Sequence, residues 1–189
     1  MKLSRVVVAG LMLSLTGCGY NQIQQLDESA AQAQKNIEVQ LQRRSDLIGN
    51  LVETVKGQSK QELAVYTDVA KARAGVTDAI SSHDPAREAD ANLQLSSQLT
   101  ILNRSVTEAY PQLKSDQAYL RLMDELTGTE NRIATARTDY NQAVETYNAY
   151  IRQFPQVVTA RLSGSKPRAY FTATAAAQEA PKVDFSTKP

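Results

Sequence analysis

An apolar seam in the last long segment of this chain most strongly constrains its fold. From position 119 to 154, residues spaced alternately four and three apart are mostly apolar: Tyr119, Met123, Leu126, Glu130, Ile133, Arg137, Tyr140, Val144, Tyr147, Ile151 and Phe154. This spacing is the heptad pattern of a coiled-coil-like helix that buries one stripe against its neighbours. It predicts a helix from about Ser115 to Gln153 and, with similar patterns elsewhere, an all-α fold.

Three earlier segments show the same helical spacing, and their ends carry recognisable signals. The first runs from Tyr20 to about Gly57, and its stripe contains Ile23, Leu26, Ala30, Ala33, Ile37, Leu41, Arg44, Ile48, Leu51 and Val55. The capping-box pattern of residues 59–62 then indicates the start of a second helix. Asp84-Pro85 has the form of an N-cap followed by the first residue of a third helix, which we expect to end near Tyr110-Pro111.

Short connections make sequential helices antiparallel, so residues 18–154 are expected to form an up-and-down four-helix bundle with long first and fourth helices. An alternative merges the first two helices through Gly57 and gives three long helices. Residues 155–189 contain four of the six prolines and show no periodicity, which predicts a mostly irregular tail. Four apolar residues of this tail are candidates for contacts with the bundle: Tyr170, Phe171, Val183 and Phe185.

The N-terminus has the features of a bacterial lipoprotein signal peptide. Lys2 and Arg5 precede an apolar run from Val6 to Leu15, which is shorter than the ~20 residues that a membrane-spanning helix needs. Leu15-Thr16-Gly17-Cys18 then resembles the lipobox. That resemblance implies removal of residues 1–17 and acylation of Cys18, including a palmitate-type chain, so that the membrane becomes a partner through lipid.

Two details bear on location. The alternative to processing is an uncleaved anchor helix with an incidental cysteine. Residue 19 is Gly and not Asp, which by resemblance to enterobacterial sorting favours the outer membrane, facing the periplasm, if the source is Gram-negative. Location in a bacterial cell membrane is therefore expected in either case.

Composition argues against several classes of function. The 21 basic and 20 acidic residues give a net charge of +1, so there is no electrostatic indication of nucleic-acid binding. A single Cys and a single His allow neither an internal disulfide nor a metal-ligand cluster, and they nearly exclude the usual nucleophile–base pairs. We expect no catalytic residues, no metal and no cofactor, and hence a protein that is not an enzyme.

Several segments, taken together and in order, resemble the LemA family. They are GCGYN (17–21), QLQRRSDLIGNLVETVKG (40–57), YPQLK (110–114), ELTGTENRIATARTDYNQAV (125–144), FP (154–155), KPRAYF (166–171) and APKVDF (180–185). The resemblance implies an anchored, bromodomain-like up-and-down four-helix bundle, and it implies no defined biochemical activity. One departure is Gly49, where the family usually has Pro; either residue weakens a helix locally.

Charged residues occupy positions where the helical pattern predicts apolar ones: Arg44, Arg73, Glu130 and Arg137, with Glu62 at the edge of the stripe. Because unpaired buried charges are costly, we expect these residues to meet in an ionic layer centred on Glu130 that fixes the helix register. The alternative is that their long side chains reach solvent at a loosely packed end. A further alternative is a layer that binds an anion.

Tyr140, Tyr147 and Tyr150 alternate with Asn141 and Asn148 on the fourth helix. A row of rings that stacks a ligand is one interpretation. Core packing with satisfied hydroxyl groups is the one that we favour.

Together these features predict a lipid-anchored protein of a bacterial envelope that works as a helical interaction or scaffold module, with one or more unidentified envelope proteins as partners. The alternative function is an envelope sensor that binds a small ligand or anion at the polar layer.

Overall fold

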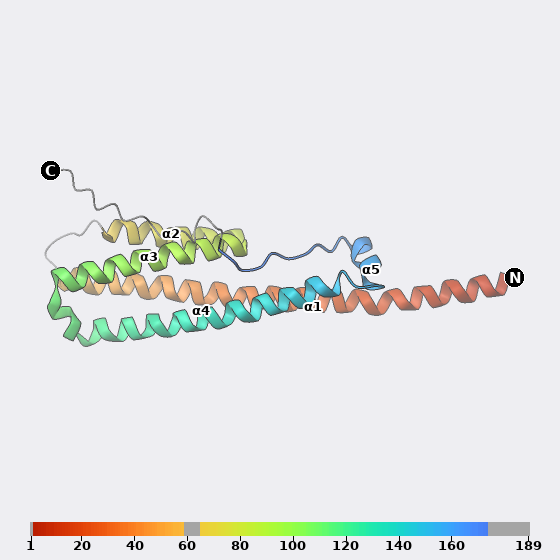
Figure 1. Ribbon diagram of the computed structural model, residues 1–189, viewed down its shortest axis with the longest axis horizontal. Helices are drawn as coiled ribbons and strands as arrows, with labels where there is room; N and C mark the ends of the chain where they lie inside the picture. The colour runs from red at the N-terminus through yellow and green to blue at the C-terminus, as the bar shows by residue number, and fades with distance from the viewer. Residues whose placement is uncertain (1, 59–64, 174–189) are drawn as a thin grey trace. The chain divides into compact units, whose positions relative to one another are not determined.

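The computed structural model describes residues 2–58 and 65–173, with side chains from residue 19 onward. Within these residues the protein is all-helical and contains no strand (Figure 1). The helices are α1 (Lys2–Gln58), α2 (Val65–Ser82), α3 (Pro85–Ala109), α4 (Gln117–Tyr150) and α5 (Gln156–Ser163), with a short 3₁₀ helix, η1 (Pro111–Ser115), before α4. The predicted all-α fold is confirmed.

The chain forms two compact units. The first unit contains Met1–Gln40 and Gly128–Tyr170, and the second contains Leu41–Thr127 and Phe171–Pro189. Helices α1 and α4 each contribute residues to both units, and α5 belongs to the first.

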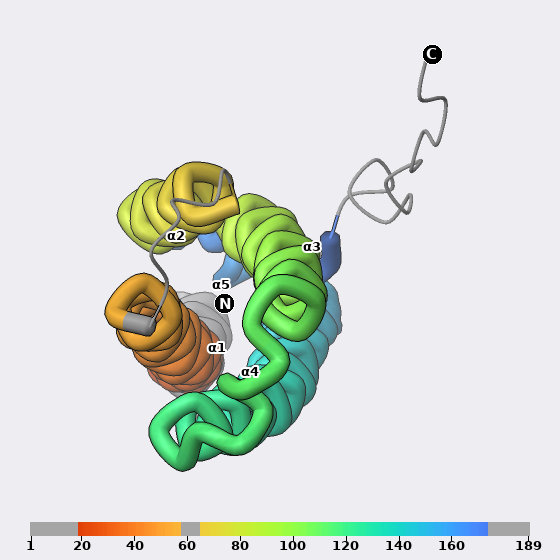
Figure 2. Tube along the Cα trace, turned by 90° about the vertical axis from the view of Figure 1, so that its left-hand side faces the viewer, coloured from red at the N-terminus to blue at the C-terminus, as the bar shows by residue number. Residues whose placement is uncertain are grey.

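The second unit is an up-and-down arrangement of four helices. The end of α1, then α2, α3 and the start of α4 alternate in direction (Figure 1), and they follow one another around a ring (Figure 2). Because α1 ends at Gln58 and α2 runs back antiparallel to it, the three-helix alternative is wrong. The buried core contains Leu41, Ile48, Leu51, Val55, Val69, Val76, Leu95, Leu102, Val106, Leu113 and Leu126.

Local signals set the ends of α3 and the start of α4. The Asp84 carboxylate accepts a hydrogen bond from the Ala86 backbone N–H at 3.0 Å, and Pro85 is the first helical residue, as predicted. Helix α3 ends just before Tyr110-Pro111, also as predicted. Asp116 caps α4 in the same manner, accepting hydrogen bonds from the backbone N–H groups of residues 118 and 119 at 2.9 Å. The capping-box residues 59–62 lie outside the described residues.

The first unit contains the N-terminal part of α1, the C-terminal part of α4, and α5. Residues of the two predicted stripes form its core: Ile23, Ala30, Ile37, Ile133, Tyr140, Val144, Tyr147 and Ile151. The predicted stripe fails at its last member, since α4 ends at Tyr150 and the Phe154 side chain is 85% exposed. The reason is Pro155, which disfavours helical geometry at the residue before it.

Helix α5 lies in the part of the chain for which the sequence predicted a mostly irregular tail. It ends at Gly164, whose φ of 73° is left-handed and suits a residue without a side chain. Ala160 of α5 packs in a cluster with Ile23, Tyr147 and Ile151. The remaining described tail, residues 164–173, contains no helix or strand.

The backbone of residues 2–18 continues α1, whereas their side chains, including Cys18, lie outside the described residues. No helix in the described part of the chain is both long and apolar enough to cross a membrane.

Candidate functional site

Polar groups from three helices meet in the interior of the second unit. Arg44 on α1 is 4% exposed, and its Nη1 donates a hydrogen bond to the Asn92 Oδ1 of α3 at 2.6 Å. Next to Arg44, Ser45 is also buried, and its Oγ accepts a longer hydrogen bond from Arg73 Nε of α2 at 3.4 Å. Glu88, one helical turn before Asn92, is fully buried. The interior of this unit is therefore polar where the sequence placed Arg44 and Arg73.

The other predicted members of the ionic layer are distributed differently. Glu130 and Arg137 are half-buried on the part of α4 that belongs to the first unit. Glu62 lies outside the described residues. A single layer centred on Glu130 therefore stays a prediction.

Sequence reasoning missed Ser45, Glu88 and Asn92 as members of the polar interior. A signal for two of them was present. The apolar stripe of the third helix is Leu95, Leu99, Leu102 and Val106, and continuing its spacing backwards from Leu95 gives Asn92 and then Glu88. Ser45 carries no comparable signal, because a small polar residue next to Arg44 is ordinary on a helix.

Gly49 allows Arg73 to lie directly against α1. A Cβ atom at position 49 would be 2.6 Å from Arg73 Nη1 and 2.7 Å from Cζ, so any side chain there would displace the guanidinium group. The two residues line a groove of about 480 Å³ between α1 and α2, together with Asp46, Lys56 and Tyr66 among others. Lys56 Nζ lies 5.6 Å from the centre of the Tyr66 ring, within the range of a cation–π contact.

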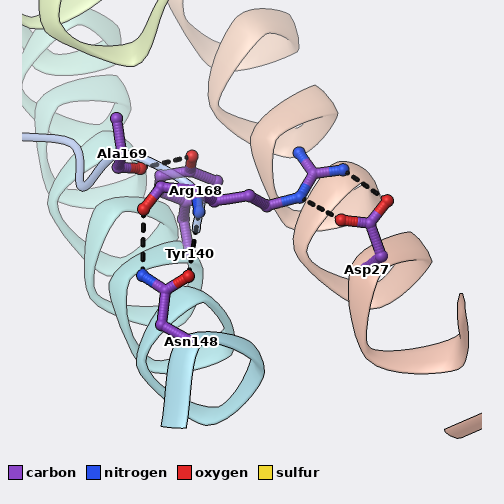
Figure 3. Close-up of polar contacts among 5 residues, drawn as sticks. All are labelled: Asp27, Tyr140, Asn148, Arg168 and Ala169. Atoms are coloured by element: carbon purple, nitrogen blue, oxygen red, sulfur yellow. Dashed lines mark hydrogen bonds and ion pairs between the residues drawn. The ribbon is translucent and has the colours of Figure 1, made fainter. Parts of the chain in front are cut away.

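In the first unit, a polar clamp holds the segment that follows α5 (Figure 3). Arg168 makes a bidentate ion pair with Asp27 of α1, with Nε–Oδ1 at 2.7 Å and Nη2–Oδ2 at 3.0 Å. The Asn148 side chain of α4 donates to the Arg168 carbonyl at 2.9 Å and accepts from the Arg168 N–H at 2.8 Å. The Tyr140 hydroxyl donates to the Ala169 carbonyl at 2.8 Å. We call these five residues and their contacts the clamp.

The clamp raises the pKa of its own Arg168 and of the neighbouring Tyr147. The hydrogen bonds with Asp27 raise the pKa of the Arg168 guanidinium. Burial raises the pKa of the Tyr147 phenol, and the negative charge of Asp27 raises it further. Each group is thus held in the protonation state that it has at neutral pH.

The clamp only partly matches the sequence analysis. Tyr140 is buried with its hydroxyl hydrogen-bonded, which confirms core packing for this tyrosine. Among the tail residues considered for contacts, Phe171 is 1% exposed whereas Tyr170 is 43% exposed. Val183 and Phe185 lie outside the described residues. Sequence reasoning missed Asp27 and Arg168, which are 141 positions apart and carry no local signal.

A second feature of the first unit is a shallow groove of about 410 Å³ between α1 and α4. Its lining is mostly small or polar: Asn36, Val39, Gln40, Asn131, Arg132, Thr135, Ala136 and Asp139. Arg132 bridges part of it through a hydrogen bond from Nε to Gln40 Oε1 at 3.3 Å. Val39, which is 61% exposed, is the largest apolar side chain of this lining. We call this feature the α1–α4 groove.

The described residues contain no group of three or more His, Cys, Asp or Glu side chains that could hold a metal ion. Three features of the described residues could bind a ligand or a partner. They are the α1–α2 groove with the Arg73 guanidinium, the segment that the clamp holds, and the α1–α4 groove.

Comparison with known proteins gives a family and a small set of relatives. Residues 33–185 match the LemA family. Two magnetosome proteins of Paramagnetospirillum magneticum, MamQ 1 and MamQ 2, are each 30% identical to this chain over 177 residues, covering 80% of this chain and 64% of the relative. MamQ of Magnetospirillum gryphiswaldense, also a magnetosome protein, is 26% identical over 175 residues with the same coverage. The chain thus spans 64% of the length of these curated relatives.

Proposed function

This chain belongs to the LemA family, and we propose that it acts as a lipid-anchored helical interaction module of a bacterial envelope, binding other proteins without catalysing a reaction. The names of its relatives associate those proteins with the magnetosome and state no activity. The proposal therefore depends on this chain's own features.

The observation that carries the proposal is the position of Leu15-Thr16-Gly17-Cys18 on α1. The backbone of α1 continues without a break from Lys2 to Gln58, so Cys18 is on the same helix that supplies the cores of both units. An acyl group on Cys18 would join the bundle to the membrane without an intervening flexible linker. Two acyl chains are enough for durable anchoring, since each buried CH₂ contributes ~0.8 kcal/mol.

Acylation is tested by labelling cells with a palmitate analogue and comparing the native chain with Cys18→Ser. We expect label on the native chain, a membrane-bound processed form, and a Cys18→Ser form that is unlabelled and retains residues 1–17. Thr16→Ser is the matched control, because it keeps a small residue in the motif and should leave labelling unchanged. Equal labelling of the native and Cys18→Ser chains would contradict acylation at this residue.

The α1–α4 groove is the surface that best suits a protein partner. Its polar side chains offer hydrogen-bonding groups to a partner, and the exposed Val39 offers an apolar contact among them. A helix pair held by a lipid anchor would keep this groove close to the membrane surface.

Partner binding is tested in cells with a photo-crosslinking residue at Thr135, an exposed position in the α1–α4 groove. We expect a crosslink to one defined envelope protein, and we expect Val39→Glu to abolish it because a charge then replaces the largest apolar side chain of the groove lining. Ile101→Glu, on the exposed side of α3, is the control and should leave the crosslink intact. Crosslinks that are scattered among abundant neighbours, or that persist in Val39→Glu, count against the proposal.

A further inference from the structure

Large apolar side chains are exposed on and beside α5. Phe154 is 85% exposed, Leu162 is 81% exposed and Val158 is 48% exposed. Val158 and Leu162 are four residues apart and therefore lie on the same face of α5, while Ala160 between them is buried against the core of the first unit. Helix α5 thus packs through Ala160 and the half-buried Val157, and it leaves the large apolar side chains of Val158 and Leu162 exposed.

These side chains lie close to the predicted acylation site. Gly19 of α1 is in contact with α5, because a Cβ atom at that position would lie 3.7 Å from Thr159 Oγ1 and 3.8 Å from Gln156 Cγ. Gly19 directly follows Cys18, and Tyr20, the next residue, is itself 46% exposed. Helix α5, which carries Val158 and Leu162, is therefore next to the start of the predicted processed chain.

The charges on α5 and the chain segments that flank it have one sign. Residues 146–178 contain no Asp or Glu, whereas Arg152, Arg161 and Lys166 are all exposed. Residues 16–26 of α1 carry no charged side chain. Exposed apolar residues flanked by Lys and Arg are typical of protein surfaces that enter the headgroup region of anionic bilayers.

We propose that Phe154, Val158 and Leu162 form a membrane-contact face, which enters the interface of an anionic lipid bilayer while Arg152, Arg161 and Lys166 contact lipid phosphate groups. The face rests on the proposed lipid anchor for its orientation, since an acyl group on Cys18 would hold α5 at the bilayer. Anchor and face together would then make two attachments, which fix how the first unit stands on the membrane. An anchor alone would leave the unit free to pivot.

The chain contains no tryptophan, so a single introduced Trp reports on one position. Leu162→Trp places the reporter on the membrane-contact face, and Ile101→Trp, at a 47% exposed position of α3, is the matched control. Each full-length variant is purified from membranes and reconstituted into vesicles of phosphatidylcholine and phosphatidylglycerol, with bromine atoms placed shallowly on the acyl chains. Interfacial helices insert only ~5–10 Å, so shallow bromines are the appropriate quenchers.

We expect the fluorescence of Leu162→Trp to be quenched and its emission to move to shorter wavelength, while Ile101→Trp keeps the emission of an exposed residue. Adding Arg161→Glu to Leu162→Trp should reduce the quenching in anionic vesicles. Equal quenching of the two reporters, or of Leu162→Trp with and without Arg161→Glu, would overturn the proposal. A concentration-dependent blue shift of Leu162→Trp without vesicles would also overturn it, because the face would then bind a second copy of the chain.

The mass of the same purified Leu162→Trp protein shows whether Cys18 is acylated. If the chain is acylated and the reporter is not quenched, the membrane-contact face is contradicted and the lipid anchor is not. If the reporter is quenched and the chain carries no acyl group, the lipid anchor is contradicted and the membrane-contact face is not.

Discussion

At the scale of single residues, the ion pair of the clamp differs from the exposed Arg–carboxylate pair of α3 in geometry and burial. Arg168 binds both oxygens of Asp27, and the side chains are 25% and 38% exposed. Arg104 and Glu108 pair at 2.9 Å on the surface of α3 with side chains that are 76% and 66% exposed. Bidentate geometry and partial burial both strengthen an ion pair, whereas water and salt weaken the exposed one.

We therefore predict different coupling energies for the two pairs in double-mutant cycles. The cycle of Asp27→Asn with Arg168→Lys should give about 1 kcal/mol, and that of Glu108→Gln with Arg104→Lys no more than about 0.5 kcal/mol. Urea unfolding of the single and double variants measures both. A coupling in the clamp as small as that on α3 would show that solvent screens Asp27–Arg168 as fully as an open surface pair.

The buried phenol of Tyr147 makes stability depend on alkaline pH. Burial and Asp27 raise its pKa in the folded protein above the ordinary value of 10.0, so the unfolded chain loses the phenolic proton first as the pH rises. The contribution of this phenol is fully present below pH 10 and is lost as the pH rises toward the folded pKa. One such group lowers the free energy of unfolding by at most about 1.4 kcal/mol per pH unit in that range.

Tyr147→Phe should therefore flatten the loss of stability above pH 10, while at pH 8 its stability relative to the native chain reflects only the lost hydroxyl group. The measurement is the free energy of unfolding in urea at several pH values from 8 to 11. Because burial also raises the pKa of Tyr119, a reduced slope should remain in the variant. An identical slope in both proteins would contradict the role of Tyr147.

At the scale of single elements, the start of α3 depends on the cap at Asp84. Its carboxylate accepts a hydrogen bond from the Ala86 N–H, and the helix has no intrahelical partner for that group. Asp84→Ala should lower the free energy of unfolding by about 1 kcal/mol, and Asp84→Asn, which retains a side-chain oxygen, by clearly less. Chemical denaturation measures both. Equal losses would mean that the negative charge near the helix start, and not the hydrogen bond, provides the stabilisation.

Elements with local signals were predicted well from the sequence. Asp84-Pro85 and Tyr110-Pro111 mark α3 because an N-cap oxygen and the restriction before proline act within a few residues. The end of α4 was missed because the apolar spacing continues through Phe154, beyond the last helical turn. Helix α5 was missed because it is only eight residues long and its buried residue is Ala160. Its sequence therefore shows no repeated spacing of large apolar residues that would predict a helix.

The sites were less predictable, for a physical reason. Arg44 and Arg73 stood out because charge interrupted an apolar stripe, and Asn92 follows from the same stripe on α3. The clamp depends on an ion pair between Asp27 and Arg168, which are 141 positions apart in the sequence. Nothing in the sequence around either residue indicates that the other is its partner. Pairing between distant residues follows from the packed fold and not from local pattern.

At the scale of the whole molecule, two helices join the two compact units. Helix α1 passes from the first unit to the second after Gln40, and α4 passes back after Thr127. If one unit unfolded alone, both helices would be cut in their interior, and each new helix end would expose backbone groups that have no partner. This cost couples the units, so we expect the chain to unfold in one cooperative transition.

The prediction is tested with one variant in each unit. Asn148→Ala removes two hydrogen bonds to the Arg168 backbone in the first unit, which should cost about 1–3 kcal/mol, and Asp84→Ala removes the α3 cap in the second. Each should shift the same single urea transition, followed by circular dichroism and by tyrosine fluorescence. Since the two sites share no partner, the double variant should equal the sum within about 0.5 kcal/mol. Two separate transitions, of which Asn148→Ala shifts one and Asp84→Ala the other, would show that the units unfold independently despite the shared helices.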